Sequence, residues 1–269
     1  MGKYIDLKCD FAFKYCMQDE VIMRSFLNAI LEGETDLITS VKYENVEMPR
    51  ENKGERGVCF DLLCTTEKGE TILVEMQNAA QRFFKTRAAF YTYSLMRRQI
   101  KRGVKWSNMK RDISRIIGIF ILGECNGEFH KAITRTSEYD RDELTESWDR
   151  IHKFFISLTH FKFDKANITT KGIWMELFKN LGNMDKIDPS VYERADEGLL
   201  KLLKKAETNA LTEEEYDLYE ASMKRLEDEI DMEQHGFERA IQLLIASGMP
   251  ISEISERLNL SKDEIESLK

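Results

Sequence analysis

Apolar positions in the first third of the chain switch between helical and strand spacing. Residues 19–31 repeat apolar side chains every three or four positions, which predicts an amphipathic helix. Residues 38–47 alternate loosely between apolar and polar and favour a strand. Residues 58–66 and 70–77 are apolar runs on either side of a short polar turn, and this arrangement predicts a β-hairpin.

The remaining apolar runs predict a helix, two strands and then only helices. A helix is expected over 81–102, followed by a buried strand over 113–122 and a further strand over 151–163. A long helix between two strands suggests a parallel crossover, so we expect an α/β fold with a mixed sheet flanked by helices. Helical spacing then predicts helices over 173–181, 192–206 and 212–247.

These patterns divide the chain into a sheet-containing domain over 1–165, a helical region over 166–247 and a small tail over 248–269. Pro250 begins one predicted helix of the tail, and Ser261 with Glu264 forms a capping box for the next. The tail therefore resembles a short helix-turn-helix. Its second helix is mostly acidic, which favours packing or partner binding over reading of DNA.

The hairpin carries two carboxylates. A three-residue turn over 67–69 with glycine last is a favoured hairpin connection, and it pairs Thr66 with Glu70. The same register places Asp61 directly opposite Glu75, with Gln77 on the same face. Two opposed carboxylates repel each other, and a divalent cation between them would remove that cost. Mg²⁺ suits such a pair because it takes oxygen ligands.

Charge is distributed unevenly over the chain. The whole sequence has a formal net charge of −8, but residues 82–115 contain eleven basic residues and one acidic residue. A segment of this kind can attract a polyanion even in an acidic protein. The alternative is a solvated helix face whose charges pair with acids elsewhere. The candidate DNA-binding residues in this part of the chain are Arg82, Lys85, Arg87, Arg97, Arg98, Lys101 and Arg102.

Other features narrow the class of protein. Asp10 and Lys14 form a second polar cluster, which either belongs to the site or simply begins a helix. The five cysteines have no C-x-x-C spacing, which makes a zinc site or a disulfide framework unexpected and favours the reducing cytoplasm. No apolar run reaches the roughly 18 residues of a membrane span, so we expect a soluble protein that does not contact membranes.

Asp61 and the run Glu75-Met76-Gln77, with 13 residues between the two acids, resemble the PD-(D/E)XK nuclease motif. The usual motif ends in lysine, and Gln77 stands in its place. The fuller pattern is similar to the Rpn family of recombination-promoting nucleases and transposase-like proteins, over roughly residues 4–163. The matching segments are 10–14, 26–31, 60–64, 74–77, Phe84 with Arg87 and Tyr91, and 99–103.

The resemblance implies a restriction-endonuclease-like core of about four strands, with an all-helical region after it. It implies DNA cleavage that depends on Mg²⁺ or Mn²⁺, with Asp61 and Glu75 as metal ligands and Gln77 as a third catalytic residue. Asp10 and Lys14 match the family's early acid and lysine. Glutamine neither acts as a general base nor carries charge.

Two functions follow from the sequence. The first is a metal-dependent DNA endonuclease of the transposase-like, recombination-promoting type. The alternative is a catalytically weak DNA- or protein-binding module that retains the nuclease fold. In either case the helical C-terminal region is a candidate surface for homo-oligomer formation.

Overall fold

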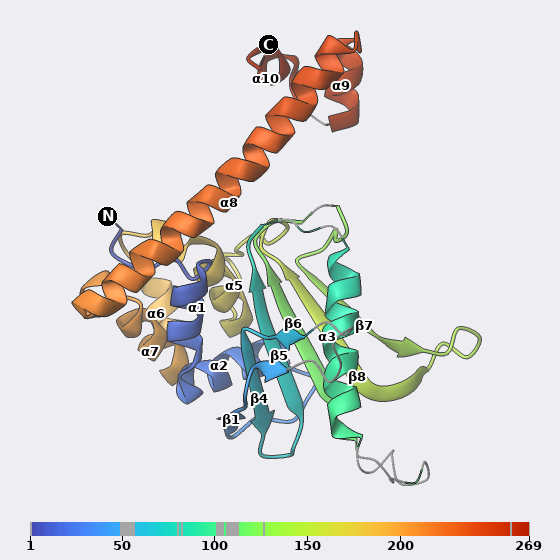
Figure 1. Cartoon of the computed structure of the whole chain (residues 1–269). Helices are drawn as coiled ribbons and strands as arrows, with labels where there is room; N and C mark the ends of the chain where they lie inside the picture. Colours follow the sequence, from blue (N-terminus) through green and yellow to red (C-terminus); the bar gives the residue numbers. More distant parts are fainter. Residues whose placement is uncertain are drawn as a thin grey trace. The chain divides into compact units, whose positions relative to one another are not determined.

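The computed structural model describes residues 2–48, 57–79, 81, 83–100, 105, 113–125, 127–258 and 260–268. The chain forms two compact units, Met1–Ser222 and Met223–Lys269. The first unit contains a six-stranded mixed sheet with helices on both faces (Figure 1). This confirms the expected α/β class with a helical C-terminal region. The sheet has two strands more than the family resemblance implied.

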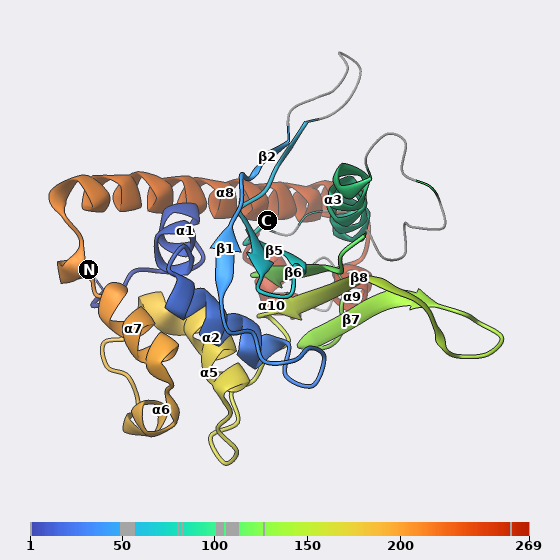
Figure 2. The ribbon, with the colours of Figure 1, turned by 90° about the horizontal axis from the view of Figure 1, so that it is seen from below.

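The sheet has the order β1-β4-β5-β6-β8-β7. Strands β5, β6 and β8 run parallel, and the other neighbours in the sheet are antiparallel. A separate two-stranded ribbon joins β2 and β3 and projects beside the hairpin (Figure 2). The strands are β1 (Val41–Tyr43), β2 (Glu47–Met48), β3 (Val58–Cys59), β4 (Leu62–Thr66), β5 (Thr71–Gln77), β6 (Ile116–Leu122), β7 (Ile133–Tyr139) and β8 (Glu146–Ser157).

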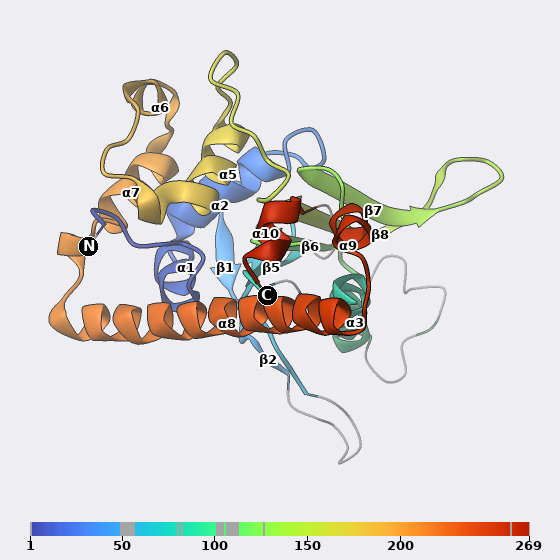
Figure 3. The same cartoon turned by 90° about the horizontal axis from the view of Figure 1, so that it is seen from above.

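Helix α3 connects the parallel strands β5 and β6, as the expected crossover requires. It covers one face of the sheet, while α1, α2 and α5 lie on the other (Figures 1 and 3). The helices are α1 (Asp10–Met17), α2 (Glu20–Ile30), α3 (Phe84–Gln99), α5 (Thr170–Asn180), α6 (Pro189–Arg194), α7 (Glu197–Lys205), α8 (Glu213–Ala246), α9 (Ile251–Leu258) and α10 (Lys262–Glu266), with 3₁₀ turns at Leu181–Asn183 and Thr208–Ala210.

Both faces of the central strands are buried, which explains their nearly continuous apolar sequence. All seven residues of β6 are buried, as expected for a strand of a parallel sheet covered on both sides. Toward α3 the core is formed by Leu73, Phe120 and Phe155 with Phe84 and Ala88 of the helix. On the opposite side, aromatic contacts tie the helices together: Phe13 and Phe26 pack against Phe178, and Phe26 also meets Trp174.

The hairpin has the register predicted from its turn. Leu62 pairs with Val74, and Thr65 pairs with Thr71. Next to the turn, the Thr66 N–H donates to the Glu70 carbonyl at 3.0 Å. Gly69 closes the turn with a φ of +79°, in the left-handed region where glycine is favoured. The turn therefore fixes which residues of the two strands face each other.

Several predicted elements differ from the structure. The strand expected over 58–66 is interrupted at residues 60 and 61, because β3 pairs with β2 whereas β4 pairs with β5. The helix expected over 192–206 is also wrong. The chain breaks between α6 and α7, where Asp196 caps the N-terminus of α7. Strand β7 was not predicted, and the strand expected over 151–163 is β8, which begins earlier and ends at Ser157.

The chain divides at a different place from the expected domain boundaries. Helices α5 and α7 pack against α2 within the first unit. In the second unit, Ile241, Ile254 and Ile265 form a small core between α8, α9 and α10. The predicted capping box is present: the Glu264 N–H donates to Ser261 Oγ, and the Ser261 N–H donates to Glu264 Oε2. Within the described ranges, no helix has the length and apolar character needed to span a membrane.

Replacement of Gly69 tests whether the turn maintains the hairpin. Gly69→Ala should lower the free energy of unfolding by about 1–2 kcal/mol, because an L-residue pays this cost in the left-handed region. No atom lies within 4 Å of the added Cβ, so the cost comes from φ alone. Gly69→Asn is the matched control and should cost less, since asparagine tolerates this conformation. Equal losses in urea denaturation of the two variants would contradict this account.

Candidate active site

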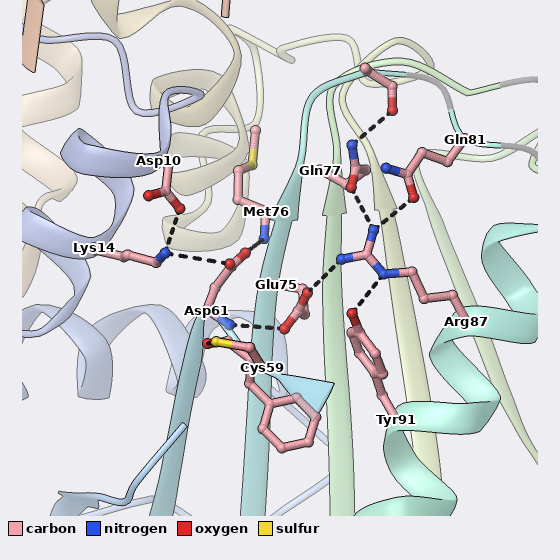
Figure 4. A network of polar contacts seen from close by, with 12 residues as sticks. Asp10, Lys14, Cys59, Asp61, Glu75, Met76, Gln77, Gln81, Arg87 and Tyr91 are labelled. Carbon is pink, nitrogen blue, oxygen red and sulfur yellow. Dashed lines mark hydrogen bonds and ion pairs between the residues drawn. The ribbon is translucent and has the colours of Figure 1, made fainter. Parts of the chain in front are cut away.

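Asp61 and Glu75 are held together by hydrogen bonds that cross the hairpin. The Asp61 N–H donates to Glu75 Oε1 at 2.9 Å, and the Met76 N–H donates to Asp61 Oδ2 at 2.9 Å. Each carboxylate therefore accepts a backbone hydrogen bond from the strand opposite (Figure 4). Asp61 lies just before β4, where the chain leaves the regular ladder, and Glu75 lies within β5. The two acids face each other as the register predicted.

The two acids differ in burial. Glu75 is only 2% exposed, although it is a charged residue, whereas the Asp61 side chain is 22% exposed. Burial and, to a smaller extent, the neighbouring Asp61 charge raise the pKa of Glu75 to about 8. Burial also raises the pKa of Asp61, against the opposing effects of the Met76 N–H and Lys14. The pair therefore holds a proton at pH values where isolated carboxylates have lost theirs.

A cation lies on each side of the pair. Lys14 Nζ is 2.6 Å from Asp10 Oδ1 and 3.8 Å from Asp61 Oδ1. Helix α1 thus carries both members of the N-terminal cluster and places Lys14 beside the hairpin (Figure 4). On the other side, Arg87 Nη2 from α3 is 3.4 Å from Glu75 Oε2. These two cations favour the ionised forms of the carboxylates.

Arg87 connects more polar groups than any other residue drawn in Figure 4. Its Nη1 donates to Gln77 Oε1 at 2.9 Å and to Gln81 Oε1 at 2.7 Å. Its Nε donates to the Tyr91 hydroxyl at 2.9 Å. Together with the contact to Glu75, these bonds fix the guanidinium at the end of β5.

Gln77 is held at both ends of its amide group. Its oxygen accepts from Arg87, and its Nε2 donates to the Ala79 carbonyl at 3.2 Å. The amide is therefore fixed in one orientation at the edge of the acid pair. The position that bears lysine in the usual motif has a neutral side chain here, and the nearest positive charge comes from Arg87.

The other basic candidates lie away from the acid pair or outside the described residues. Lys85 Nζ donates to the Glu128 carbonyl at 2.8 Å. Arg97 and Arg98 are exposed in the last turn of α3, about 15 Å along the helix from Arg87 at 1.5 Å per residue. Arg82, Lys101 and Arg102 lie outside the described part of the chain.

The donor set fits Mg²⁺ better than it fits zinc. Among the described residues, no group of three or more His, Cys, Asp or Glu side chains could hold a metal ion. Mg²⁺ does not need such a group, because one or two carboxylates with water and substrate phosphates complete its octahedron. Asp61 and Glu75 are the two carboxylates that would hold it.

Sequence reasoning missed Gln81 and Tyr91 as members of the polar network. It named Arg87 among the segments that match the family and as a DNA-binding residue, but not as a partner of Glu75. One signal was present in the sequence, because Arg87 and Tyr91 are four positions apart and therefore adjacent on a helix. The contact between Arg87 and Glu75 depends on how α3 lies against β5. The pattern of α3 alone does not give that information.

The fold and the paired acids are those of a PD-(D/E)XK nuclease domain. Residues 7–235 match the family model described as PD-(D/E)XK nuclease family transposase, so the chain belongs to that family. This confirms the family expected from the motifs and supports a nuclease-like function. Searches of curated proteins and of solved structures give no match.

Because the pKa of Glu75 is raised in the folded protein, we expect the protein to become less stable as the pH rises. Between the ordinary pKa of 4.5 and about 8, native Glu75 keeps a proton that the unfolded chain has released. The free energy of unfolding in metal-free buffer should therefore decrease through this range. Glu75→Gln cannot titrate, so its decrease should be smaller. Urea denaturation with a chelator from pH 5 to about 9 measures both slopes.

Glu193→Gln, on the exposed surface of α6, is the matched control and should keep the wild-type slope. Added Mg²⁺ should stabilise the wild type more at high pH than at low pH, because the metal competes with the proton for the same oxygens. Identical slopes for the wild type and Glu75→Gln would contradict the raised pKa of Glu75.

Proposed function

We propose that the protein is a Mg²⁺-dependent DNA endonuclease of the transposase-like, recombination-promoting type, with Mn²⁺ as an alternative ion. The observation that carries this proposal is the acid pair. A buried glutamate and a half-buried aspartate face each other across a hairpin, and each is oriented by a backbone N–H of the opposite strand. The family supports a nuclease that acts on DNA.

The catalytic roles follow from the contacts. Asp61 and Glu75 would hold the ion, which when bound would lower the pKa of a water molecule and offset the charge that develops on the phosphate. Gln77 positions water through its fixed amide. Lys14 favours the ionised form of Asp61, and Asp10 orients Lys14. Arg87 favours the ionised form of Glu75 and provides the positive charge that the usual motif takes from lysine.

DNA docking is assigned to the basic segment that contains α3. Arg97 and Arg98 are exposed at the C-terminal end of this helix, and Lys85 lies in its first turn. Arg82, Lys101 and Arg102 complete the set in the sequence. Contacts of this kind bind phosphates without reading bases, so they position the strand and do not select a sequence.

Removal of either acid should abolish cleavage. Asp61→Asn and Glu75→Gln keep the size of the side chain but remove one negative charge from the ion site. Nicking of a plasmid in Mg²⁺ should fall at least about a hundredfold, because the metal contributes several kcal/mol to the transition state. Asp185→Asn, at an exposed position, is the control and should leave the rate unchanged.

Wild-type cleavage that persists in a chelator, or in both acid variants, would contradict the proposed site. An absence of cleavage of any DNA form in Mg²⁺ would favour the alternative, a binding module that retains the nuclease fold. The uncharged Gln77 in place of lysine is the feature that keeps this alternative open.

An exchange of positions 77 and 87 tests the role of Arg87. Gln77→Lys alone places an ammonium group where Arg87 Nη1 now donates to the amide oxygen, 2.9 Å away. The like charges should reduce nicking roughly tenfold or more, and Arg87→Gln alone should also reduce it. The double variant restores one cation beside Glu75 and should be more active than either single variant.

Arg98→Gln, an exposed arginine of the same helix, is the matched control for loss of positive charge on α3. It should weaken DNA affinity but leave the rate at saturating DNA unchanged. If the nicking rate of the double variant falls by the product of the two single-variant losses, the two positions act independently. That result would contradict the proposed role of Arg87.

A further inference from the structure

A groove lies directly beside the polar network, between the start of α3 and the end of β3. It has a volume of about 740 Å³, within the range of roughly 300–1,000 Å³ that is usual for ligand pockets. Phe83, Phe90 and Tyr91 contribute aromatic rings to its lining, and Arg87 and Gln81 contribute polar groups. Arg87 and Gln81 also belong to the network around Glu75 and are seen together in Figure 4. The groove therefore shares Arg87 and Gln81 with the candidate active site.

Two of the rings in the groove are exposed. Phe83 is 73% exposed and Phe90 is 43% exposed. Positions 83, 87 and 90 are spaced by four and three residues, so they lie on one face of the helix start. A different face, with Phe84, Ala88 and Leu95, packs into the core. Helix α3 thus has one aromatic face in the core and a second along the groove.

The backbone at Phe83 also departs from ordinary geometry. Its φ is +62°, in the left-handed region, which a bulky side chain rarely adopts. Phe83 is the N-cap residue of α3, makes no side-chain capping hydrogen bond and exposes its ring, although Ser, Thr, Asp or Asn is preferred at such a position. Unfavourable placements of this kind are concentrated at binding sites.

The charge and the aromatic lining of the groove indicate which class of ligand it binds. Among the described residues that line it, Arg87 is the one with a charged side chain. Aromatic rings combined with a positive charge are the features that bind single-stranded nucleic acid, because bases stack on the rings and the backbone follows the cation. A base inside a duplex has both of its faces covered by its neighbours, so it stacks on protein only after it leaves the duplex.

We propose that this groove receives an unpaired nucleobase of the DNA strand whose phosphate lies at Asp61 and Glu75. The base stacks against Phe83 and Phe90, and Arg87 lies between the base and the acid pair. This inference rests on the proposed nuclease function and adds a substrate class to it. The preferred substrate is single-stranded or locally unpaired DNA, and a fully paired duplex is a poor one.

Binding measurements that do not depend on cleavage test this inference. The full chain carrying Asp61→Asn is titrated against three fluorescent DNA forms, and fluorescence anisotropy gives the affinity for each. The three forms are a single strand, the matching blunt duplex and the same duplex with an unpaired bulge. The single strand and the bulged duplex should bind at least tenfold more tightly than the blunt duplex. Introducing Phe83→Gly or Phe90→Ala into the Asp61→Asn chain should weaken binding of the single strand and of the bulged duplex by roughly 5- to 150-fold, as expected when one base-stacking ring is removed.

Folding is monitored separately. Phe83→Gly should not lower the melting temperature, because glycine adopts a φ of +62° readily. Tyr139→Ala, which removes a 61% exposed ring at the end of β7, is the matched control and should leave all three affinities unchanged.

Equal affinity for the three DNA forms, or binding insensitive to both phenylalanines, overturns the inference. In that event, Mg²⁺-dependent nicking by the wild type leaves the proposed function standing. If no DNA form binds and none is cleaved, both proposals fail. A wild-type dimer that becomes a monomer in Phe83→Gly, with unchanged DNA affinity, overturns the inference by assigning the groove to a second copy of the chain.

Discussion

The structure around the candidate site depends on one constraint, which is the burial of the Glu75 carboxylate inside a sheet. A buried charge is costly unless it is hydrogen-bonded and compensated. The Asp61 N–H meets the first requirement, and Arg87 meets the second in part, since the pKa of Glu75 stays raised. The chain leaves the regular ladder just before β4, and the Asp61 N–H is therefore free of the ladder and donates to the Glu75 carboxylate. The break in the predicted strand thus provides a hydrogen bond to the acid pair. An uninterrupted strand would have committed that N–H to a backbone carbonyl.

The same constraint accounts for the position of α3. Arg87 reaches Glu75 from the first turn of the helix, and Tyr91 one turn later accepts from the guanidinium. Below these polar contacts, Phe84 and Ala88 enter the core against Phe120 and Phe155. The apolar contacts fix the helix on the sheet, and the polar contacts fix its start at the end of β5. The groove beside this start therefore has a rigid wall on the side of the acid pair.

Local rules in the sequence were sufficient for the hairpin and the crossover. A three-residue turn ending in Gly69 has few favourable forms, so turn length alone gave the register that sets Asp61 opposite Glu75. Strand β6 was recognisable because a strand buried on both faces is apolar at every position. The long helix between β5 and β6 then required a parallel pair.

Other features depend on partners distant in the sequence. Strand β7 mixes threonine and glutamate with few apolar residues. Within the described part of the chain it pairs with β8 alone, at the edge of the sheet, so its pattern is weak. The break at residue 61 arises because β3 pairs with β2 and not with β5. Arg87 is one of eleven basic residues in its segment, and spacing along the helix does not show which of them reaches β5. Local patterns thus predicted the acids but not the cation that compensates them.

The balance of charge explains why an uncharged residue is acceptable at position 77. The network contains three carboxylates, of Asp10, Asp61 and Glu75, and two cations, Lys14 and Arg87. With all groups ionised it has one excess negative charge, and a bound divalent ion would change this to one excess positive charge. A phosphodiester carries one negative charge and would neutralise the remainder. A lysine at position 77 would add a further positive charge next to Arg87, where the amide of Gln77 now accepts a hydrogen bond without electrostatic cost.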